Sequence, residues 1–347
     1  MTLAAELKER ARQAGASLAG IASARPAAQA ALAEGLLPGP ESESLAYLRR
    51  DADVRQDIRR WYPEAKSVLV CGFSYGGQGP TVPEGAGPSP LAGRDAGMGR
   101  IARYALHEDY HRSLKLRMQE VLAWLRDRQP GADGRIFVDS SPVRERLYGA
   151  AAGLGWIGRN RLLISETAGS FFLIAGLALN LELEPDRPVP GRCGSCRRCL
   201  DACPTGALGP EGGFRAGRCI AYLTIEHRGP VPPGLRRGVG CWVAGCDLCQ
   251  EACPWNEGRT AAGVLEPLLP GDLPLAELAG LGEPSFRERF GRTPLTRLKR
   301  RGLARNALLA MGNSGDARLR PVLERFRADP DPVLQEQALW SLSRLPD

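Results

Sequence analysis

Nine of the ten cysteines lie between residues 193 and 253, with the spacing of an electron-transfer site. One run reads CGSCRRCLDACP, the other reads CDLCQEACP, and both end in Cys-Pro. Three thiolates at C-x2-C-x2-C-x3-C-P spacing surround one cubane iron–sulfur cluster, and the fourth reaches a neighbouring cluster. The spacing therefore predicts that the chain carries single electrons through two [4Fe–4S] clusters. The runs contain Cys193, Cys196, Cys199 and Cys203, followed by Cys246, Cys249 and Cys253.

The second run lacks one upstream ligand, and Cys219 is the natural substitute. Cys241 competes with Cys219 for this place. Cys71 stands alone in an apolar stretch, where we expect a buried small hydrophobic residue. The ferredoxin rule that the fourth cysteine serves the other cluster then divides the ligands into two sets. One set is Cys193, Cys196, Cys199 and Cys253, and the other is Cys203, Cys219, Cys246 and Cys249.

Structural zinc is the main alternative, because zinc also binds four cysteines arranged in C-x2-C pairs. Zinc requires neither a third cysteine at the same short spacing nor a repeated Cys-Pro ending, so clusters explain the pattern better. A disulfide framework is disfavoured because the length and composition are those of an intracellular protein.

The composition indicates a globular protein with more than one domain. The chain has 347 residues, 43% of them hydrophobic and 24% charged, and this length predicts two or three domains. The N-terminal residues form a charged helical pattern without the apolar core of a secretory signal. The longest apolar run, residues 171–181, is about half as long as a membrane span. We therefore expect a cytoplasmic monomer with no membrane contact.

A cluster of cations lies near the C-terminal end. The net charge is +7, and residues 287–305 contain eight basic side chains and one acid, Glu288. Such cations usually form a solvated helix face, but here they recur on successive turns almost without acids, which favours binding to a polyanion. The expected nucleic-acid contacts are Arg297, Lys299, Arg300, Arg301 and Arg305.

Hydrophobic periodicity predicts an α/β domain over residues 1–185. Residues 66–75, 135–139 and 171–183 have the pattern of buried strands, and residues 3–14 and 110–128 that of amphipathic helices. A Gly/Pro-rich stretch at residues 76–99 reads as a long loop.

Two further domains are expected after a linker at residues 185–190. Residues 186–262 hold the cysteines and form a ferredoxin-like two-cluster domain. Residues 263–347 form an α-helical HEAT-like domain, with three apolar-striped helices. So short an array cannot bury its own faces and must dock on the rest of the protein. The three helices are expected within residues 296–313, 316–328 and 332–345.

Asp139 is the acidic residue with the most suggestive position, because it ends a predicted strand. It could cap a helix that begins near Pro142. It could also be a general acid, since open α/β sheets place active sites beyond the carboxyl ends of their strands, where apolar neighbours would keep the carboxyl protonated. His107, His111 and His227 show no metal-binding spacing, and we expect them to be surface or core residues.

A glycine motif at residues 153–158 matches the dinucleotide fingerprint G-x-G-x-x-G. That fingerprint requires a preceding strand and an acidic residue some twenty positions later. The preceding sequence SPVRERLYGAAA is helical in pattern, and the acidic context is absent. No nicotinamide site is therefore expected.

Taken together, several segments make the chain resemble the epoxyqueuosine reductase family, which completes queuosine synthesis in tRNA. The resemblance covers nearly the whole chain. It implies base-off cobalamin in the N-terminal α/β domain, two [4Fe–4S] clusters, a tRNA with a queuosine-type anticodon loop, and an external one-electron donor. The segments are RYALHEDYH (103–111), VDSSPVRERLYGAAAGLGWIGRNRLLI (138–164), CPWN (253–256) and RGLARNALLAMGN (301–313).

The resemblance also assigns individual residues. It implies that Asp139 is the proton donor facing cobalt, and that Arg55, Ala102 and the segment from Leu163 to Ile174 line the corrin. Two other functions fit part of the pattern. A reductive dehalogenase-like enzyme for a small molecule is disfavoured by the basic C-terminal part, and a ferredoxin-type carrier is disfavoured by the large N-terminal domain and Asp139.

Overall fold

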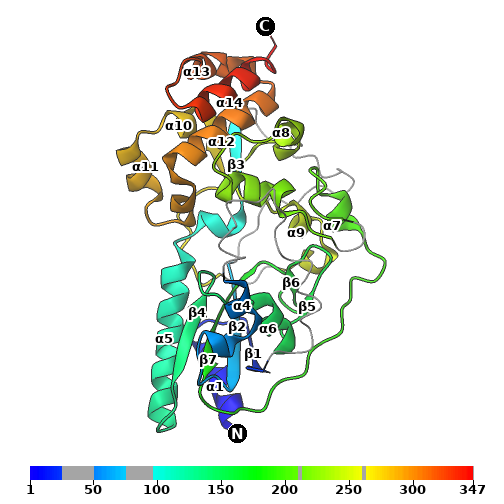
Figure 1. The fold of residues 1–347 in the computed structure, drawn as a ribbon, viewed down its shortest axis with the longest axis vertical. Coiled ribbons are helices and arrows are strands. Elements are labelled where there is room, and N and C mark those ends of the chain that lie inside the picture. Colours follow the sequence, from blue (N-terminus) through cyan, green and yellow to red (C-terminus); the bar gives the residue numbers. More distant parts are fainter. Residues whose placement is uncertain (26–50, 76–96, 210–212, 260–262, 347) are drawn as a thin grey trace.

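The computed structural model describes residues 1–25, 51–75, 97–209, 213–259 and 263–346. The N-terminal part lies at one end of an elongated molecule and the C-terminal helices lie at the other, with the cysteine-rich segment along one side (Figure 1). Most of the predicted loop at residues 76–99 lies outside the described residues. Its last two residues, Met98 and Gly99, belong to a strand.

The N-terminal part is built on a four-stranded sheet with the order β1-β2-β7-β4. Every neighbouring pair is antiparallel, with Val70 opposite Gly176 and Phe137 opposite Gly176. The three predicted strands are present, whereas β1 escaped the sequence analysis. Strands and helices are combined as expected of an α/β domain, but the sheet is antiparallel, so the rule about carboxyl ends of parallel strands does not apply here. The strands are β1 (Leu18–Ser23), β2 (Ser67–Ser74), β4 (Gly134–Val138) and β7 (Phe172–Leu179).

Both faces of this sheet are covered, which explains why β2 is apolar along its whole length. Alternate residues such as Leu69 and Phe73 pack with the helices α1 (Leu3–Gln13) and α5 (Tyr110–Arg128). Val68 and Val70 face the opposite side, with α6 (Glu145–Ala151). Cys71 is fully buried on the first side, as predicted, and burial raises the pKa of its thiol to about 12. Two short helices precede β2, α4 (Ala52–Gln56) and η3 (Ile58–Arg60).

A second sheet, with the order β8-β3-β9, joins three distant segments of the chain. The strand β3 (Met98–Ile101) pairs in parallel with β8 (Trp242–Ala244) and antiparallel with β9 (Asp272–Pro274). Each predicted domain therefore contributes one strand. Independent folding of residues 1–185, 186–262 and 263–347 stays a prediction. The short helix η4 (Arg103–Leu106) follows β3.

The cysteine-rich segment consists of short elements that depend on close backbone contacts. Just before it, a hairpin of β5 (Trp156–Ile157) and β6 (Leu163–Ile164) carries the glycine motif. A Cβ on Gly155 would lie 1.9 Å from the Ile164 carbonyl oxygen, so glycine is required there. Helix α6 precedes the motif, as the pattern of SPVRERLYGAAA predicted. The helices of the segment are α7 (Arg198–Asp201), η5 (Ala216–Arg218), η6 (Tyr222–Glu226), α8 (Pro233–Val239), α9 (Leu248–Glu251) and η7 (Pro254–Asn256).

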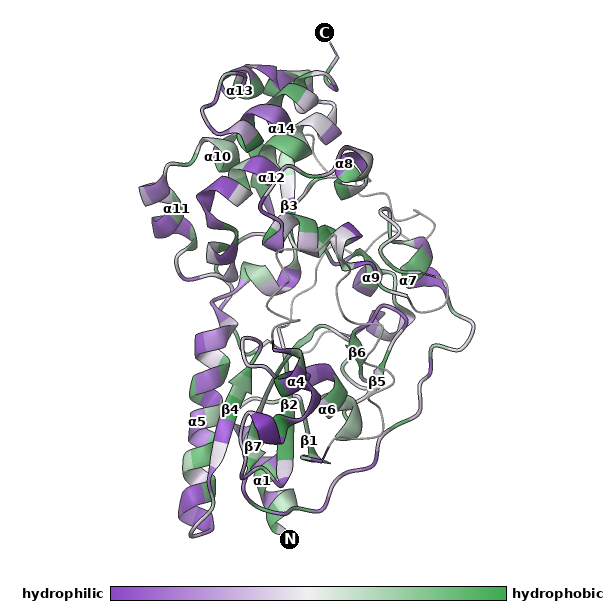
Figure 2. Ribbon diagram, in the orientation of Figure 1, coloured by the Kyte–Doolittle hydropathy of each residue, from purple (hydrophilic) through white to green (hydrophobic). Residues whose placement is uncertain are grey.

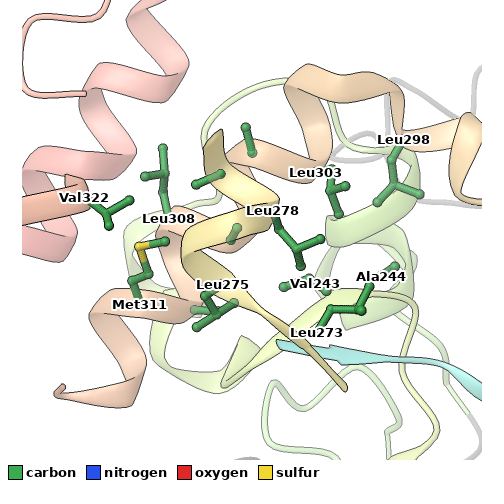
Figure 3. Packing of buried hydrophobic residues seen from close by; sticks show 14 of the residues in the cluster. Val243, Ala244, Leu273, Leu275, Leu278, Leu298, Leu303, Leu308, Met311 and Val322 are labelled. Atoms are coloured by element: carbon green, nitrogen blue, oxygen red, sulfur yellow. The ribbon is translucent and has the colours of Figure 1, made fainter. Parts of the chain in front are cut away.

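The C-terminal helices dock on the rest of the molecule, as predicted. Leu303 and Leu308 of the central helix pack with Leu278 and with Val243 of β8 in one apolar core (Figure 3). In Figure 2, α12 and α14 carry both apolar and polar stretches, whereas α11 is mostly hydrophilic. The elements are α10 (Leu275–Gly280), α11 (Glu283–Phe290), η8 (Pro294–Leu298), α12 (Lys299–Ser314), η9 (Ala317–Leu319), α13 (Arg320–Glu324) and α14 (Pro332–Leu342).

The apolar run at residues 171–181 forms β7 at the centre of the main sheet. Over the described ranges of the chain, no helix has both the length and the apolar character that a membrane crossing requires.

Candidate active site

A cavity of about 890 Å³ lies where the N-terminal part, the cysteine-rich segment and η8 meet. The beginning of α5 contributes Tyr110 and His111 to its wall, and the turn after β4 contributes Asp139. From the cysteine-rich segment come Cys219 and apolar residues of η6. The remaining lining includes Arg55, Tyr104, Glu145, Leu147, Tyr222, Ile225, Pro294 and Arg297.

Asp139 accepts hydrogen bonds from two neighbours on α5. The Tyr110 hydroxyl donates to its Oδ2 at 2.8 Å, and His111 Nε2 lies 3.1 Å from the same oxygen. The predicted capping role is wrong, because Arg144 occupies the N-cap of α6 without a side-chain hydrogen bond. Asp139 also has a φ of 48°, a left-handed conformation that is uncommon for a residue other than glycine. A carboxyl held in such a conformation and directed into a cavity suits a functional role.

His111 lies between two carboxylates. Its Nδ1 is 2.7 Å from Asp109 Oδ1, and its Nε2 contacts Asp139. A carboxylate can only accept, so both ring nitrogens must donate, and this requires the imidazolium form. The hydrogen bonds to Asp109 and Asp139 raise the pKa of His111 to about 9. His111 therefore carries a proton at neutral pH in the wall of the cavity.

The same contacts change what is expected of Asp139. Burial raises the pKa of its carboxyl, but the hydrogen bonds from His111 and Tyr110 outweigh burial, and the pKa falls below its ordinary value. The prediction that apolar neighbours keep Asp139 protonated is wrong, because its neighbours are a cation and a hydroxyl group.

Glu145 is a second acid in this wall, and the sequence analysis missed it. Its Oε1 accepts a hydrogen bond from the backbone N–H of Asp139. Burial, followed by the negative charge of Asp139, raises the pKa of Glu145 to about 8. Glu145 is therefore mainly protonated at neutral pH. The only signal in the sequence is a weak one, an acid six residues after Asp139 at the start of a helix.

Only part of the predicted corrin-binding set lines the cavity. Arg55 and Asp139 lie in its wall. Ala102, Leu163 and Ile174 are not among the described residues that line this cavity, and their contact with a corrin stays a prediction. Ala102 is packed beneath Gly245, Leu163 against Gly149, and Ile174 lies in the main sheet.

Four cysteines surround a second cavity of about 450 Å³. Burial is the largest cause that raises the pKa of Cys199 to about 11, and Cys253, Cys193 and Cys196 raise it further. Thiolates in such a group repel one another, so the site favours bound cations that offset their charge. The cysteines are those of the first predicted set, Cys193, Cys196, Cys199 and Cys253.

A second group of cysteines lies near the first: Cys249 interacts with Cys199, and Cys219 lines the large cavity. Burial and then Cys249 and Cys219 raise the pKa of Cys246, and Cys203 acts in the same way on Cys219. Cys219 therefore takes part in these thiol interactions. Cys241 is buried beside β8, where its carbonyl oxygen accepts from Arg100 N. Across the described ranges, no three His, Cys, Asp or Glu side chains converge closely enough to hold a single metal ion.

The basic stretch has more acidic partners than its sequence suggests. Glu226, Glu266 and Asp331 come from more distant segments, so charge counting within the stretch cannot detect them, whereas Glu277 and Glu283 lie shortly before it. Lys299 is exposed at the start of α12 and has a φ of 60°. The ion pairs are Arg287 with Glu283, Arg289 with Glu277, Arg292 with Glu266, Arg297 with Glu226, and Arg301 with Asp331.

Arg305 corrects the predicted nucleic-acid set. Its side chain is buried, and the residue is only 1% exposed. The guanidinium donates to the carbonyl oxygens of Leu223, His227 and Gly229. Arg305 therefore fastens α12 to the cysteine-rich segment and has no surface for a phosphate.

The two other histidines have core roles, as expected. His107 Nδ1 lies 3.0 Å from the Arg103 carbonyl oxygen, and His227 Nε2 lies 2.9 Å from the Pro230 carbonyl oxygen. Burial lowers the pKa of both rings, which favours their neutral form.

Two family models match the chain. Residues 192–256 match a 4Fe-4S double cluster binding domain, which contains both cysteine groups. Residues 55–140 match "Epoxyqueuosine reductase QueG, DUF1730", a segment that extends from Arg55 to just beyond Asp139. The first match favours clusters over structural zinc.

Curated relatives and solved structures agree with these matches. An epoxyqueuosine reductase from Gloeobacter violaceus is 36% identical over 90% of this chain and 97% of its own length, and one from Xanthomonas campestris pv. campestris is 34% identical over 98% and 96%. The solved Streptococcus thermophilus epoxyqueuosine reductase is similar in fold, with a TM-score of 0.87 and 27% identity over 100% of this chain and 92% of that one. With close agreement over nearly its full length, the chain belongs to the epoxyqueuosine reductase family.

Proposed function

We propose that the chain reduces epoxyqueuosine to queuosine in tRNA. Family membership supports this activity over a small-molecule dehalogenase or a simple electron carrier. A solved epoxyqueuosine reductase in complex with an epoxyqueuosine-modified tRNA-Tyr stem loop has a TM-score of 0.84 to this chain, with 28% identity over 99% of it and 90% of that chain. The observation that carries the proposal is the position of Asp139, His111 and Glu145 in one cavity wall, beside a cysteine of the cluster domain.

The two groups of thiols would hold the two [4Fe–4S] clusters. The first cluster would be held by Cys193, Cys196, Cys199 and Cys253, and the second by Cys203, Cys219, Cys246 and Cys249. Cys249 lies near Cys199 of the first group, and Cys219 lines the large cavity. This order supports a path for electrons from an external one-electron donor, through the first group and then the second, to the cavity.

The large cavity fits cobalamin, which the family resemblance implies. The cavity suits a broad, flat group because of its volume and its mixed lining. Apolar residues (Leu147, Ile225 and Pro294) form part of the wall, and Arg55 and Asp139 form a polar edge. Bound there, reduced cobalamin would supply a strong nucleophile and reductant. Arg55 and the apolar wall would orient it and exclude water, so that the reaction is separated from solvent.

The carboxyl and imidazole groups would store and transfer the protons that the reaction consumes. Converting an epoxide to an alkene releases its oxygen as water and consumes two electrons and two protons. His111 would hold one proton at Nε2, and Asp139 Oδ2 would pass it to the developing alkoxide, a poor leaving group until it is protonated. Glu145 would supply the second. A solved Bacillus subtilis reductase is described with a catalytic aspartate loop swung out of its active site, which supports a carboxyl in this role.

The tRNA would approach from the side of η8 and α12. Arg297 lines the cavity, while Lys299, Arg300 and Arg301 follow at the start of α12. These cations would contact phosphates, and the modified nucleotide would leave its loop to enter the cavity.

The test combines composition with turnover. Protein prepared without oxygen is analysed for iron, sulfide and cobalt, and is then given reductant and an epoxyqueuosine-modified stem loop. The expected result is two clusters, stoichiometric cobalamin binding and conversion to queuosine. Zinc in place of iron, or full conversion without bound corrinoid, would contradict the proposal.

A further inference from the structure

The hairpin loop that follows α6 contains two buried nitrogen donors beside the first cysteine group. Trp156 is 4% exposed and Asn160 is 5% exposed. Trp156 Nε1 and Asn160 Nδ2 are buried, and neither has a hydrogen-bond partner within the described residues. Unsatisfied buried N–H groups are uncommon in native proteins and call for a partner.

The amide of Asn160 has a defined orientation. Its Oδ1 accepts from the backbone N–H of Leu162 at 3.2 Å, so that end must be the oxygen. The NH₂ end then points elsewhere. Asn160 lines the 450 Å³ cavity together with the four cysteines of the first group.

Trp156 approaches the same cysteines from β5. Its ring belongs to a small buried cluster with Cys253 and Cys193, and it packs edge-on against Trp255 with ring centroids 5.0 Å apart. An indole N–H can only donate. Cluster sulfides are acceptors, so a cluster held by these four cysteines would supply the missing partner.

We propose that Trp156 Nε1–H and Asn160 Nδ2–H donate hydrogen bonds to the sulfur atoms of the first cluster and raise its reduction potential. This inference rests on the proposed ligand set. Reduction adds negative charge to the cluster, and N–H donors stabilise the more negative state. The hairpin thereby makes the first cluster an easier acceptor for electrons from outside the protein.

The test is a redox titration of Trp156→Phe in which the reduction of each cluster is monitored by electron paramagnetic resonance. Phenylalanine keeps an aromatic ring but removes the donor without adding charge. At a fixed potential we expect the oxidised-to-reduced ratio of one cluster to rise about ten-fold, which corresponds to ~59 mV for one electron. Asn160→Leu should shift the same signal in the same direction. Trp255→Phe is the packing control and should shift it much less.

Hyperfine couplings in the unmutated protein provide a second measurement. Pulsed electron paramagnetic resonance of the reduced first cluster, with ¹⁵N-labelled tryptophan, should detect a coupled indole nitrogen and a coupled exchangeable proton. If the first cluster has the same reduction potential in Trp156→Phe, Asn160→Leu and Trp255→Phe, the inference is overturned. Two intact clusters in these variants would still support the ligand set. If Trp156→Phe fails to assemble, absence of the coupling in the unmutated protein overturns the inference. Missing iron and sulfide in the unmutated protein would instead contradict the proposed function.

Discussion

Asp139 and His111 form a pair whose properties arise from contact rather than from either residue alone. Asp139 lies at the end of β4 and His111 in the first turn of α5, and Asp109 holds the imidazole from its other side. At neutral pH the proton is on His111, so the pair consists of an imidazolium and a carboxylate. A carboxylate that receives its proton from a neighbour can act repeatedly as an acid.

Replacing Asp139 by asparagine should remove this acid while keeping the size of the side chain. We expect turnover of the modified stem loop to fall at least ~100-fold, the lower end for loss of a general acid, with both clusters retained. Asp133→Asn is the matched control, because Asp133 precedes the same strand and pairs with Arg126 on the surface. Turnover of Asp139→Asn within a few-fold of the control would remove Asp139 from the mechanism.

The pKa of His111 also predicts how stability depends on pH. Folding raises this pKa from 6.5 to about 9, because Asp109 and Asp139 hold the imidazolium. The stabilisation is fully present below pH 6.5 and is lost as the pH rises through about 9. The thermal midpoint of the unmutated protein should therefore approach that of His111→Gln over this interval. A difference between the two midpoints that stays constant from about pH 6 to about pH 10 would contradict the ion-pair assignment.

At the scale of elements, α12 and α14 pack closely against each other. Gly312 faces α14 so closely that an added Cβ would lie 2.7 Å from Ser341 Cα. Gly302, near the start of the same helix, has its nearest neighbour at an ordinary 3.7 Å. Alanine substitutions at these two glycines therefore distinguish the effect of packing on stability from the effect of helix propensity.

Gly312→Ala should lower stability by about 1–3 kcal/mol, because α14 must move to admit the methyl group. Gly302→Ala should raise stability by about 0.5–1 kcal/mol, since alanine favours the helix. Thermal unfolding of the two variants measures both effects. Equal changes in the two midpoints would mean that α12 and α14 do not pack closely against each other.

The surface of the same element should determine the salt dependence of tRNA binding. Replacing both Lys299 and Arg300 by alanine should weaken stem-loop binding and lower the salt slope by about 1 for each phosphate that is no longer neutralised. Arg318→Ala, which removes an exposed cation paired with Asp316, should leave the slope unchanged. The slope comes from binding isotherms at several salt concentrations. A slope unaffected by the double change would place the tRNA elsewhere.

At the scale of the whole molecule, the cysteine-rich segment connects the two ends. Arg100 of β3 pairs with Glu251 of α9 at 3.0 Å, and Asp247 accepts from the backbone N–H of Arg103 at 2.7 Å. Both acids lie between cysteines of the second run. The cysteine run therefore contacts the second sheet directly, through Glu251 and Asp247.

Removing iron should release this connection. Without clusters, α9 loses its anchors, and hydrogen exchange should rise across residues 192–256 and in β3 and β8. The main sheet should stay protected, because its core packs against α1 and α5. Hydrogen-exchange mass spectrometry of protein with and without iron tests this. An equal rise in β2 and β7 would show that the N-terminal part also depends on the clusters.

The sequence predicted those features that depend on local pattern. The cysteine spacing indicated the two thiol runs, because short C-x2-C spacers hold neighbouring thiols on one loop, and it left Cys219 and Cys241 as candidates for the remaining place. Strong periodicity located β2, β7, α1 and α5 to within a few residues. The short strand β1 and the antiparallel order escaped, since strand direction depends on which distant strands pair.

What the sequence by itself determined was therefore chemistry that lies within one segment: the thiol runs, the buried strands and the position of Asp139. Only the tertiary structure decided the protonation of Asp139, His111 and Glu145, and the burial of Arg305. The physical reason is that a charge responds to every group within a few ångströms of it. Those groups come from separate elements, which only the folded chain brings together.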